Sequence, residues 1–333
     1  MSKKNKIIVT GGAGYIGSHT LVELSANDFE PIIVDNLCNT SIQNIQGAEK
    51  IIGKSISFYK VDCTDEDALN AVFEQEKSIE GAIHFAAFKS VEESVREPEK
   101  YHSNNIGSLQ VLLNVMKKHN VENIIFSSSC TVYGSPDILP VSESAPFKKA
   151  ESPYGETKQL CEELLNNTKI SSISLRYFNP IGSHESGVIG DCSSDKASNL
   201  VPIITETAIG KREQITVFGD DYDTPDGTCL RDYIHVVDLA NAHVKALQYV
   251  MKNKGKSAFN IGTGNGVSVL EAIHIFEKVN NIKVNYKIGP RRAGDVEKIY
   301  SDNTLSTNEL KWKAQKTLDT AMLSAWKWEN QKK

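Results

Sequence analysis

A segment with four glycines follows a short run of β-branched residues near the start of the chain. The run Ile7–Thr10 predicts a buried strand, and the segment GGAGYIG that follows it leads into a stretch with helical patterning. Gly11 permits the tight turn, Gly14 lets the backbone approach a diphosphate, and Gly17 lets the helix pack closely on the strand. Free N–H groups and the positive end of the helix then face the phosphates. The segment therefore predicts a strand–turn–helix unit that binds a dinucleotide.

An acidic residue stands where the next predicted strand ends. Asp35 closes the apolar run 32–35, at a separation of about twenty residues that dinucleotide sites require. A carboxylate here accepts hydrogen bonds from the adenosine ribose hydroxyls and repels a 2′-phosphate, which favours NAD over NADP. The preceding strand, the following helix and this acid separate a dinucleotide site from an ordinary glycine-rich turn. We therefore predict that the chain binds NAD.

Short apolar runs alternate with longer helical stretches through the first half of the chain. The runs are 7–10, 32–35, 57–62, 82–86, 123–127 and 172–178. Helical patterning covers Tyr15–Ala26 and Pro98–His119. Alternating β and α segments predict a parallel sheet with helices on both faces, which is a Rossmann-type doubly wound α/β fold. The nearly continuous apolar character of the runs is typical of strands buried on both faces.

The pattern changes after about residue 179. Residues 180–231 are rich in glycine, serine, aspartate and proline, and they carry few long periodic runs. A helix is predicted over Val236–Val250 and a short strand over Ala258–Ile261, and residues 285–330 end in an amphipathic, tryptophan-containing segment. The sequence therefore predicts a larger nucleotide-binding domain and a smaller, loop-rich α/β substrate domain.

The overall composition limits the classes of molecule that the chain could bind. Of the 333 residues, 40% are hydrophobic and 24% are charged, as in a globular chain with a sizeable core. The formal net charge of -5 argues against binding to a nucleic-acid backbone, which needs a basic surface. We see no secretory signal and no apolar run near the ~18–20 residues that span a bilayer. The six cysteines form no CxxC pair, so we expect no disulfide framework, no metal site and a reducing, cytoplasmic setting.

A tyrosine and a lysine lie four positions apart in the segment SPYGETK. Ser152 is suited to cap a helix and Pro153 to occupy its first position, so the spacing puts Tyr154 and Lys158 on one helix face. A phenol with a pKa of ~10 is a poor base at neutral pH, but a cation within ~4–6 Å can lower that pKa by 1–3 units. A YxxxK pair alone is a weak signal. This pair, however, follows the hydroxyl-rich strand end at 127–133, on the carboxyl edge where open α/β sheets bind ligands.

Taken in order, the motifs resemble those of the extended short-chain dehydrogenase/reductases that act on nucleotide sugars. The stretches are TGGAGYIG at 10–17, DN at 35–36, HFAA at 84–87, SSSCTVYG at 127–134, SPYGETK at 152–158 and RYFNP at 176–180. Later stretches are similar to those of UDP-glucose 4-epimerases: VFGDDYD at 217–223, DGT at 226–228, RDYIHV at 231–236 and RRAGD at 291–295. The resemblance covers nearly the whole chain. It implies interconversion of UDP-glucose and UDP-galactose by transient oxidation at sugar C4 with tightly bound NAD.

The resemblance also implies roles for individual residues. Tyr154 would be the catalytic base and acid, Lys158 would lower its pKa and bind the nicotinamide ribose, and Ser129 would relay the proton of the sugar 4-hydroxyl. The residues implied to line the NAD site are Gly11, Gly14, Tyr15, Ile16, Gly17, Asp35, Asn36, Asn39, Thr40, Asp62, Cys63, Phe85, Ala86, Lys89, Asn104, Tyr154, Lys158 and Phe178. Those implied to hold the UDP-sugar are Ser129, Tyr154, Asn179, Asn199, Leu200, Phe218, Arg231, Arg292, Asp295 and Ile299.

The residue types at the UDP end suit this implied ligand. Arg231 and Arg292 carry planar, bidentate donors that can clamp a diphosphate, and Phe218 can pack against uracil. Ile299 stands where the family varies between a bulky tyrosine and smaller residues, a position that limits access of N-acetylated sugars. UDP-N-acetylglucosamine therefore stays open as a substrate. Residues 191–198 lack the family's usual Pro-Gln-Gly segment, which leaves the lid over the substrate undetermined.

Several alternatives remain beside this interpretation. An epimerase of another UDP-sugar, either UDP-N-acetylglucosamine or a UDP-pentose, carries the same motifs. A 4,6-dehydratase is disfavoured because residues 129–131, Ser-Cys-Thr, offer no carboxylate for elimination of water. A non-catalytic NAD-sensing protein on the same fold is disfavoured because such proteins typically lack the Tyr–Lys pair.

The resemblance finally implies an assembly and a division of the chain. The family suggests a homodimer. Residues 1–179 plus about 234–262 would form the NAD-binding Rossmann domain. Residues from about 180–233 plus 263–333 would form the UDP-sugar-binding domain, with the catalytic site in the cleft between them.

Overall fold

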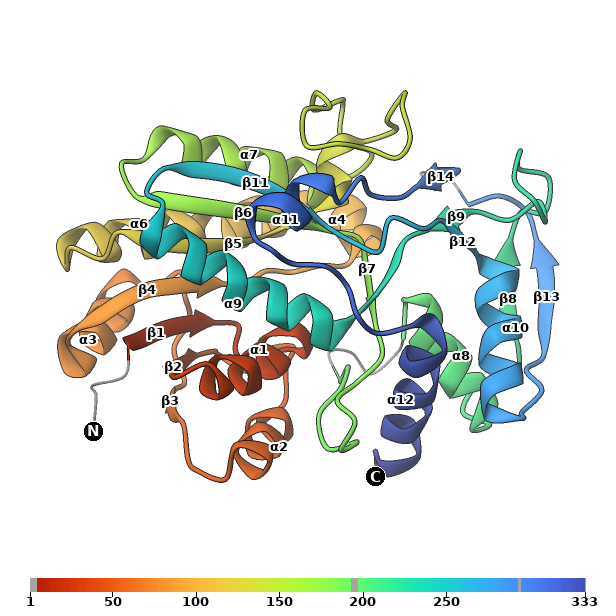
Figure 1. Ribbon diagram of the computed structural model, residues 1–333, viewed down its shortest axis with the longest axis horizontal. Helices are drawn as coiled ribbons and strands as arrows, with labels where there is room; N and C mark the ends of the chain where they lie inside the picture. The colour runs from red at the N-terminus through yellow and green to blue at the C-terminus, as the bar shows by residue number, and fades with distance from the viewer. Residues whose placement is uncertain (1–4, 193–196, 293–294, 333) are drawn as a thin grey trace.

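The fold is built on a parallel sheet of seven strands. The computed structural model describes residues 5–192, 197–292 and 295–332. The strands are ordered β11-β6-β5-β4-β1-β2-β3, and every neighbouring pair is parallel (Figure 1). Their bounds are β1 (Asn5–Thr10), β2 (Phe29–Val34), β3 (Ser57–Tyr59), β4 (Ile79–His84), β5 (Asn123–Ser129), β6 (Ser171–Tyr177) and β11 (Lys256–Ile261). The strand order reverses at β1, which confirms the predicted doubly wound sheet.

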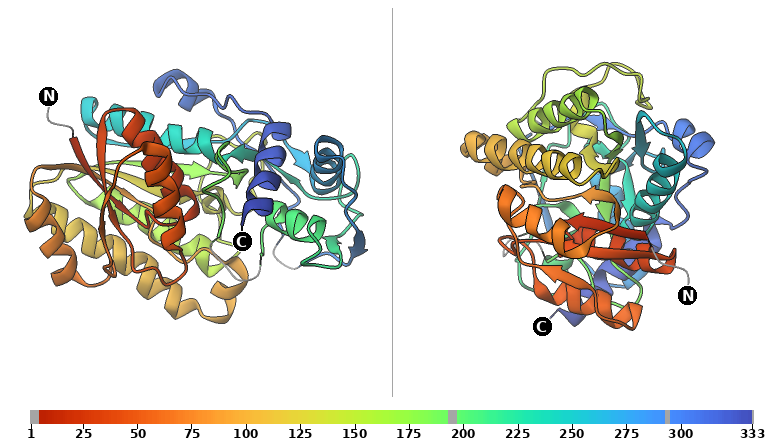
Figure 2. Two further views of the ribbon diagram at one scale, coloured as in Figure 1. Left: turned by 90° about the horizontal axis from the view of Figure 1, so that it is seen from below. Right: turned by 90° about the vertical axis from the view of Figure 1, so that its left-hand side faces the viewer.

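Helices cover both faces of this sheet (Figure 2). One face is covered by α1 (Tyr15–Ala26), α2 (Ile42–Ile52) and α9 (Val236–Lys252). The other face is covered by α3 (Glu66–Glu76), α6 (Gly107–Lys118) and α7 (Pro153–Asn167). Successive strand residues point to opposite faces. In β1, for example, Ile7 and Val9 pack under the first set of helices and Ile8 under the second. Burial on both faces explains the continuous apolar runs of the sequence.

Two helices show how local sequence places the later site residues. The Ser152 hydroxyl accepts a hydrogen bond from the Gly155 N–H, and Pro153 opens α7, as predicted. The helix predicted over Pro98–His119 is instead divided. It consists of α5 (Pro98–Tyr101), a wide π-helical turn η1 (His102–Ile106) and α6, preceded by the separate helix α4 (Val91–Arg96). The wide turn lets the Asn105 amide bond to both backbone groups of Phe88, a contact that a 3.6-residue period cannot reveal.

A smaller lobe lies at the carboxyl edge of the sheet, on the right of Figure 1. Its helices α8, α10 and α12 pack around one apolar core. Its elements are β7 (Asn179–Ile181), α8 (Leu200–Ala208), β8 (Ile215–Phe218), β9 (Leu230–Arg231), β10 (Tyr233–His235), β12 (Val267–Ser268), α10 (Val269–Asn280), β13 (Tyr286–Gly289), β14 (Lys298–Ile299) and α12 (Leu318–Gln331). The sequence pattern did not indicate α8, because its first turns are almost uniformly apolar and carry no amphipathic period.

The chain passes between the two lobes several times. After the smaller lobe begins with β7, α9 and β11 return to the large sheet, and so does α11 (Thr304–Glu309) before α12 leaves it again. Asp232, buried between β9 and β10, connects the segments that pass between the lobes. Its carboxylate accepts hydrogen bonds from the Thr263 N–H at 2.8 Å and the Ser301 hydroxyl at 2.6 Å. The lobes are therefore tied together at their junction rather than joined by one linker.

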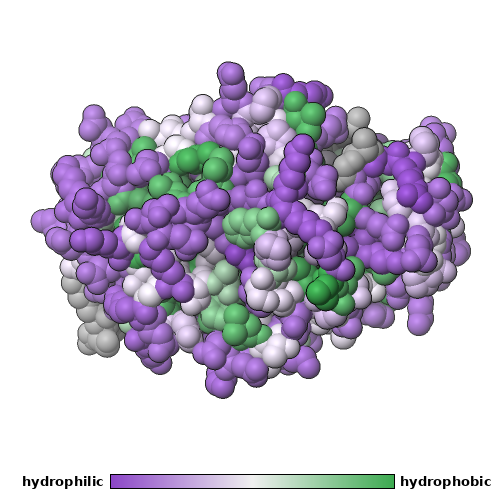
Figure 3. Space-filling view, turned by 90° about the horizontal axis from the view of Figure 1, so that it is seen from above, coloured by the Kyte–Doolittle hydropathy of each residue, from purple (hydrophilic) through white to green (hydrophobic). Residues whose placement is uncertain are grey.

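The surface is mostly polar. The face shown in Figure 3 is largely hydrophilic, with hydrophobic residues in separate small groups. Within the part of the chain that the structure describes, none of the helices has both the length and the apolar character needed to cross a bilayer.

Candidate active site

A cleft of about 700 Å³ runs along the carboxyl edge of the large sheet and continues between the two lobes. All the residues predicted to line the NAD site line this cleft, and so do all those predicted to hold the UDP-sugar except Ile299. One continuous space thus brings together the glycine turn, the Tyr–Lys pair and the arginines.

The glycine turn forms one end of the cleft. Gly11 has a φ of +70°, and a Cβ there would lie 2.7 Å from the Ala86 nitrogen. A Cβ on Gly17 would lie 2.4 Å from the Gly11 carbonyl oxygen, so α1 packs against the turn only because this residue has no side chain. Among the residues that the structure describes, no side chain caps α1, whose N-cap is Gly14. The N–H groups of its first turn are therefore free to meet an anion in the cleft.

Asp35 lies at the edge of the cleft at this end. It is buried directly after β2, and its carboxylate accepts hydrogen bonds from the Ala13 N–H at 3.0 Å and the Thr40 hydroxyl at 2.8 Å. Further along this edge, the Asn36 amide donates to the Asp62 carboxylate at 2.9 Å. These bonds hold the acids in place at the ends of β2 and β3, where both line the cleft.

The middle of the cleft holds the Tyr–Lys pair. Tyr154 in the first turn of α7 and Ser129 at the end of β5 both line the cleft. The buried Lys158 ammonium lies 5.7 Å from the centre of the Tyr154 ring and donates a hydrogen bond to the Ser127 carbonyl oxygen at 2.6 Å. The structure therefore brings a phenol, a hydroxyl and an ammonium group together, as the sequence predicted.

The pKa values differ from the expectation of a phenol activated by lysine alone. Burial raises the pKa of Tyr154 to about 12, although its hydrogen bond with the Ser129 hydroxyl acts to lower it. Burial also lowers the pKa of Lys158 to about 8. Burial is the largest influence on the pKa of Tyr154 in the chain alone, and the Lys158 ammonium is directed at the Ser127 carbonyl oxygen. The lowering of the phenol pKa by Lys158 stays a prediction.

The far end of the cleft carries the two predicted arginines around a carboxylate. Arg292 donates to Asp295 at 2.7 and 3.1 Å, and Arg231 lies 3.9 Å from the same carboxylate. The guanidinium of Arg292 also lies over the Phe218 ring, 5.3 Å from its centre. Phe218 is 38% exposed, which is unusual for a phenylalanine and leaves a ring face in the cleft. Two cations beside an open aromatic ring suit a diphosphate joined to a base.

Arg291 of the RRAGD stretch and Ile299 lie outside the cleft lining. Arg291 points away from the cleft, where it stacks on Tyr222 at 4.0 Å and pairs with Asp221 at 2.7 Å. Ile299 pairs with Arg231 across β14 and β9 but packs in a small buried cluster with Phe178, outside the cleft lining. Residues 193–196 of the atypical loop and residues 293–294 of the RRAGD motif lie outside the described residues.

The structure also adds cleft residues that the sequence did not indicate. Ser127 and Tyr177, hydrogen-bonded to each other, lie beside the Tyr–Lys pair. The far end is completed by Thr216, Val217, Cys229, Tyr233 and Val269. Tyr177 could have been found, because it stands inside the RYFNP motif. Ser127, Val217 and Tyr233 could have been found in the same way, because they stand in the stretches 127–134, 217–223 and 231–236. Thr216, Cys229 and Val269 carry no distinctive sequence signal.

Known proteins with the same arrangement identify the family. Residues 7–262 match the NAD dependent epimerase/dehydratase family. The UDP-glucose 4-epimerase of Haemophilus influenzae is 47% identical over 97% of each chain. This chain belongs to the UDP-glucose 4-epimerases. It is thus a member of the extended short-chain dehydrogenase/reductases and an NAD-dependent enzyme, which sets aside the non-catalytic NAD sensor.

Solved structures of this family have the same fold. A UDP-glucose-4-epimerase from Stenotrophomonas maltophila, with bound NAD and formylated UDP-arabinopyranose, superposes with a TM-score of 0.95 at 42% identity, covering 99% of this chain and 98% of that one. The epimerase from Bifidobacterium longum in complex with NAD+ and UDP gives 0.94 at 43%, covering 98% and 99%. The glycine turn, uncapped α1 and buried Asp35 of the present chain fit NAD on their own geometry.

Proposed function

We propose that the chain interconverts UDP-glucose and UDP-galactose by inverting the configuration at C4 of the sugar. The observation that carries the proposal is the single cleft in which Tyr154, Lys158 and Ser129 lie between the glycine turn and the arginine end. The diphosphate would be held by Arg231 and Arg292, so the sugar would extend toward Tyr154. Affinity placed in the UDP half leaves the sugar itself weakly held and able to present either face.

The protein's own groups manage the proton. Tyr154 takes the proton of the 4-hydroxyl, Ser129 hydrogen-bonds to the same oxygen, and the proton returns by the same path. Bound NAD supplies reversible hydride transfer at C4 and a positive nicotinamide ring. The Lys158 ammonium, 5.7 Å from the centre of the Tyr154 ring, would favour the phenolate against burial, which raises the pKa of Tyr154 to about 12. The 4-keto sugar formed in between stays bound through its UDP anchor, so no net redox change occurs.

The test uses the purified enzyme and UDP-galactose alone, with the nucleotide sugars resolved by chromatography or proton NMR. We expect conversion toward UDP-glucose, lost in Tyr154→Phe and unaffected in Tyr249→Phe, a matched change on α9 outside the cleft. No conversion after addition of NAD would refute the assignment to UDP-hexoses. NADH accumulating in step with turnover would refute the cycle without net redox change.

Acceptance of N-acetylated sugars is a second candidate. Ile299, the position thought to restrict them, packs in a buried cluster and leaves the cleft lining free of its side chain. UDP-N-acetylglucosamine and a UDP-pentose should therefore be offered beside UDP-galactose. The relative kcat/KM values decide between the three.

Three further features belong to the same proposal. We propose a homodimer and a cytoplasmic location. We also propose a division of the chain into an NAD-binding part, residues 1–179 plus about 234–262, and a UDP-sugar-binding remainder. The return of β11 to the large sheet beside β6 supports that division. Light scattering of the purified enzyme tests the dimer.

A further inference from the structure

Behind the catalytic surface, a buried carboxylate joins α7 to β5. Ser127 and Ser129 line the cleft, and Ser128 between them points to the opposite face of the strand. There its hydroxyl donates a hydrogen bond to Glu162, which lies one helical turn beyond Lys158. The strand that carries Ser129 and the helix that carries Tyr154 are thus connected on the side away from the substrate.

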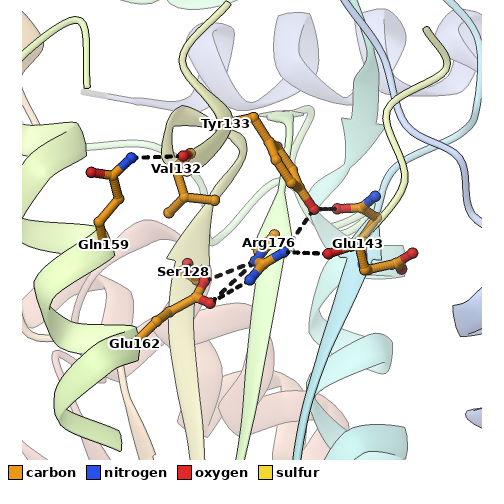
Figure 4. A network of polar contacts seen from close by, with 8 residues as sticks. Ser128, Val132, Tyr133, Glu143, Gln159, Glu162 and Arg176 are labelled. Atoms are coloured by element: carbon orange, nitrogen blue, oxygen red, sulfur yellow. Dashed lines mark hydrogen bonds and ion pairs between the residues drawn. The ribbon is translucent and has the colours of Figure 1, made fainter. Parts of the chain in front are cut away.

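Glu162 is in turn held by Arg176 of β6. The arginine donates to both carboxylate oxygens, through Nε at 3.0 Å and Nη2 at 2.7 Å (Figure 4). Its Nη1 donates to the Tyr133 hydroxyl at 3.0 Å, and that hydroxyl donates to Asn260 of β11 at 2.6 Å. Every side chain of this network is buried. Three adjacent strands and α7 therefore converge on one carboxylate.

Burying such a network costs free energy of folding, and a role in fixing the geometry of the active site would offset that cost. Burying an ion pair often stabilises a fold no more than apolar side chains of the same volume would. A displacement of about 1 Å at a reacting centre, in contrast, can reduce a rate by about a hundredfold. The network ties α7 to β5 on the side away from the cleft, and the Lys158–Ser127 hydrogen bond ties the same two elements on the cleft side.

We propose that Glu162, held by Arg176 and Ser128, is a positioning residue that sets α7 against β5 so that Tyr154, Lys158 and Ser129 stay aligned. This inference rests on the proposed function, because it takes Tyr154 and Lys158 as the reacting groups. Glu162 does not touch the cleft. Its effect on catalysis would therefore be carried by the residues that it holds.

The carboxylate has a second effect, on the charge of Lys158. The titratable groups around that ammonium are His84 of β4 and Tyr154, Cys161 and Glu162 of α7. Burial lowers the pKa of Lys158, and Cys161 and then the Glu162 carboxylate act to raise it. Burial lowers the pKa of His84 to about 3, so this histidine is neutral at working pH. Loss of the Glu162 charge should therefore let Lys158 lose its proton at lower pH.

The decisive experiment compares the pH profiles of kcat and KM for wild type, Glu162→Gln and Ser128→Ala with UDP-galactose. We expect kcat of Glu162→Gln to fall by about 10- to 100-fold, with KM within about twofold and the alkaline limb moved to lower pH. Ser128→Ala keeps the ion pair between Glu162 and Arg176, so its kcat should fall less, by about threefold. The alkaline limb of its pH profile should lie at the same pH as in the wild type. Glu206→Gln removes a less buried carboxylate–arginine pair in the smaller lobe, outside the cleft lining, and should match the wild type.

The outcomes separate this inference from the proposed function. If Glu162→Gln and Ser128→Ala both keep the wild-type kcat and pH profile, the positioning role is wrong. If Glu162→Gln changes KM rather than kcat, or if Glu206→Gln loses as much kcat as Glu162→Gln, the positioning role is also overturned. Should Glu162→Gln fail to fold, as an unpaired buried Arg176 could cause, the kcat of Ser128→Ala decides alone. A wild type that does not epimerise UDP-galactose would instead refute the proposed function itself.

Discussion

The ammonium nitrogen of Lys158 lies 2.6 Å from the backbone carbonyl oxygen of Ser127. A carbonyl oxygen can only accept, so this bond favours the protonated lysine and fixes the ammonium at the strand end. Ser129, two residues further along β5, reaches Tyr154. The end of one strand therefore orients both partners of Tyr154, and under the proposed function the activity should depend on the protonation of Lys158.

We expect kcat to fall above about pH 8. Burial lowers the pKa of Lys158 from the ordinary 10.5 to about 8, and catalysis needs the charged form. Stability should respond in the opposite direction: between pH 8 and 10.5 the unfolded chain binds more protons at this lysine, so its contribution to folding rises with pH. Rate and thermal-melting profiles over this range check both. A rate that stays constant to pH 10 would contradict the role of Lys158.

Removing either member of the pair should reduce turnover without loss of structure. Tyr154→Phe keeps the ring and loses only the hydroxyl, so kcat should fall by about 10²–10⁴-fold, the usual contribution of a positioned acid–base group. Lys158→Met keeps the stem and should also reduce kcat. Steady-state kinetics beside UDP binding measure the effect. Weakened UDP binding in Tyr154→Phe would argue against a role limited to the reacting centre.

The two cleft arginines should be distinguishable from their exposed neighbour. Arg231→Ala and Arg292→Ala should each raise KM by about 10- to 100-fold, because hydrogen bonds to charged groups contribute about 1.5–3 kcal/mol. Arg291→Ala is the matched control, since its side chain lies on Tyr222 outside the cleft. Equal effects at 291 and 292 would place the diphosphate elsewhere.

The glycine turn offers a test that is independent of the sugar. In Gly17→Ala the added Cβ would lie 2.4 Å from the Gly11 carbonyl oxygen, so α1 must move and the NAD site should be lost. Gly107→Ala also adds one methyl group to a helix, but it meets nothing within 4 Å. Calorimetric titration with NAD should show binding in the second variant only. Unchanged NAD affinity in Gly17→Ala would mean that the turn does not form the cofactor site.

The sequence was sufficient where a local rule and the tertiary structure agree. The glycine turn, the start of α7 at Ser152 and the Tyr–Lys face follow from backbone geometry and helix period alone. The sequence was insufficient where contacts between distant segments determine the position or the pKa of a side chain. Arg291 and Arg292 are adjacent in sequence, yet only the fold determines which one enters the cleft. The pKa of Tyr154 likewise depends on burial, which no spacing of residues reveals.

The repeated passage of the chain between the lobes has a mechanical consequence. A two-lobed enzyme with one linker can open and close about it, whereas here several segments and the Asp232 bonds cross the junction together. Bending would have to deform all of them at once. The walls of the cleft should therefore behave as a stiff frame, and the reorientation that inverts C4 becomes a motion of the tethered sugar inside it.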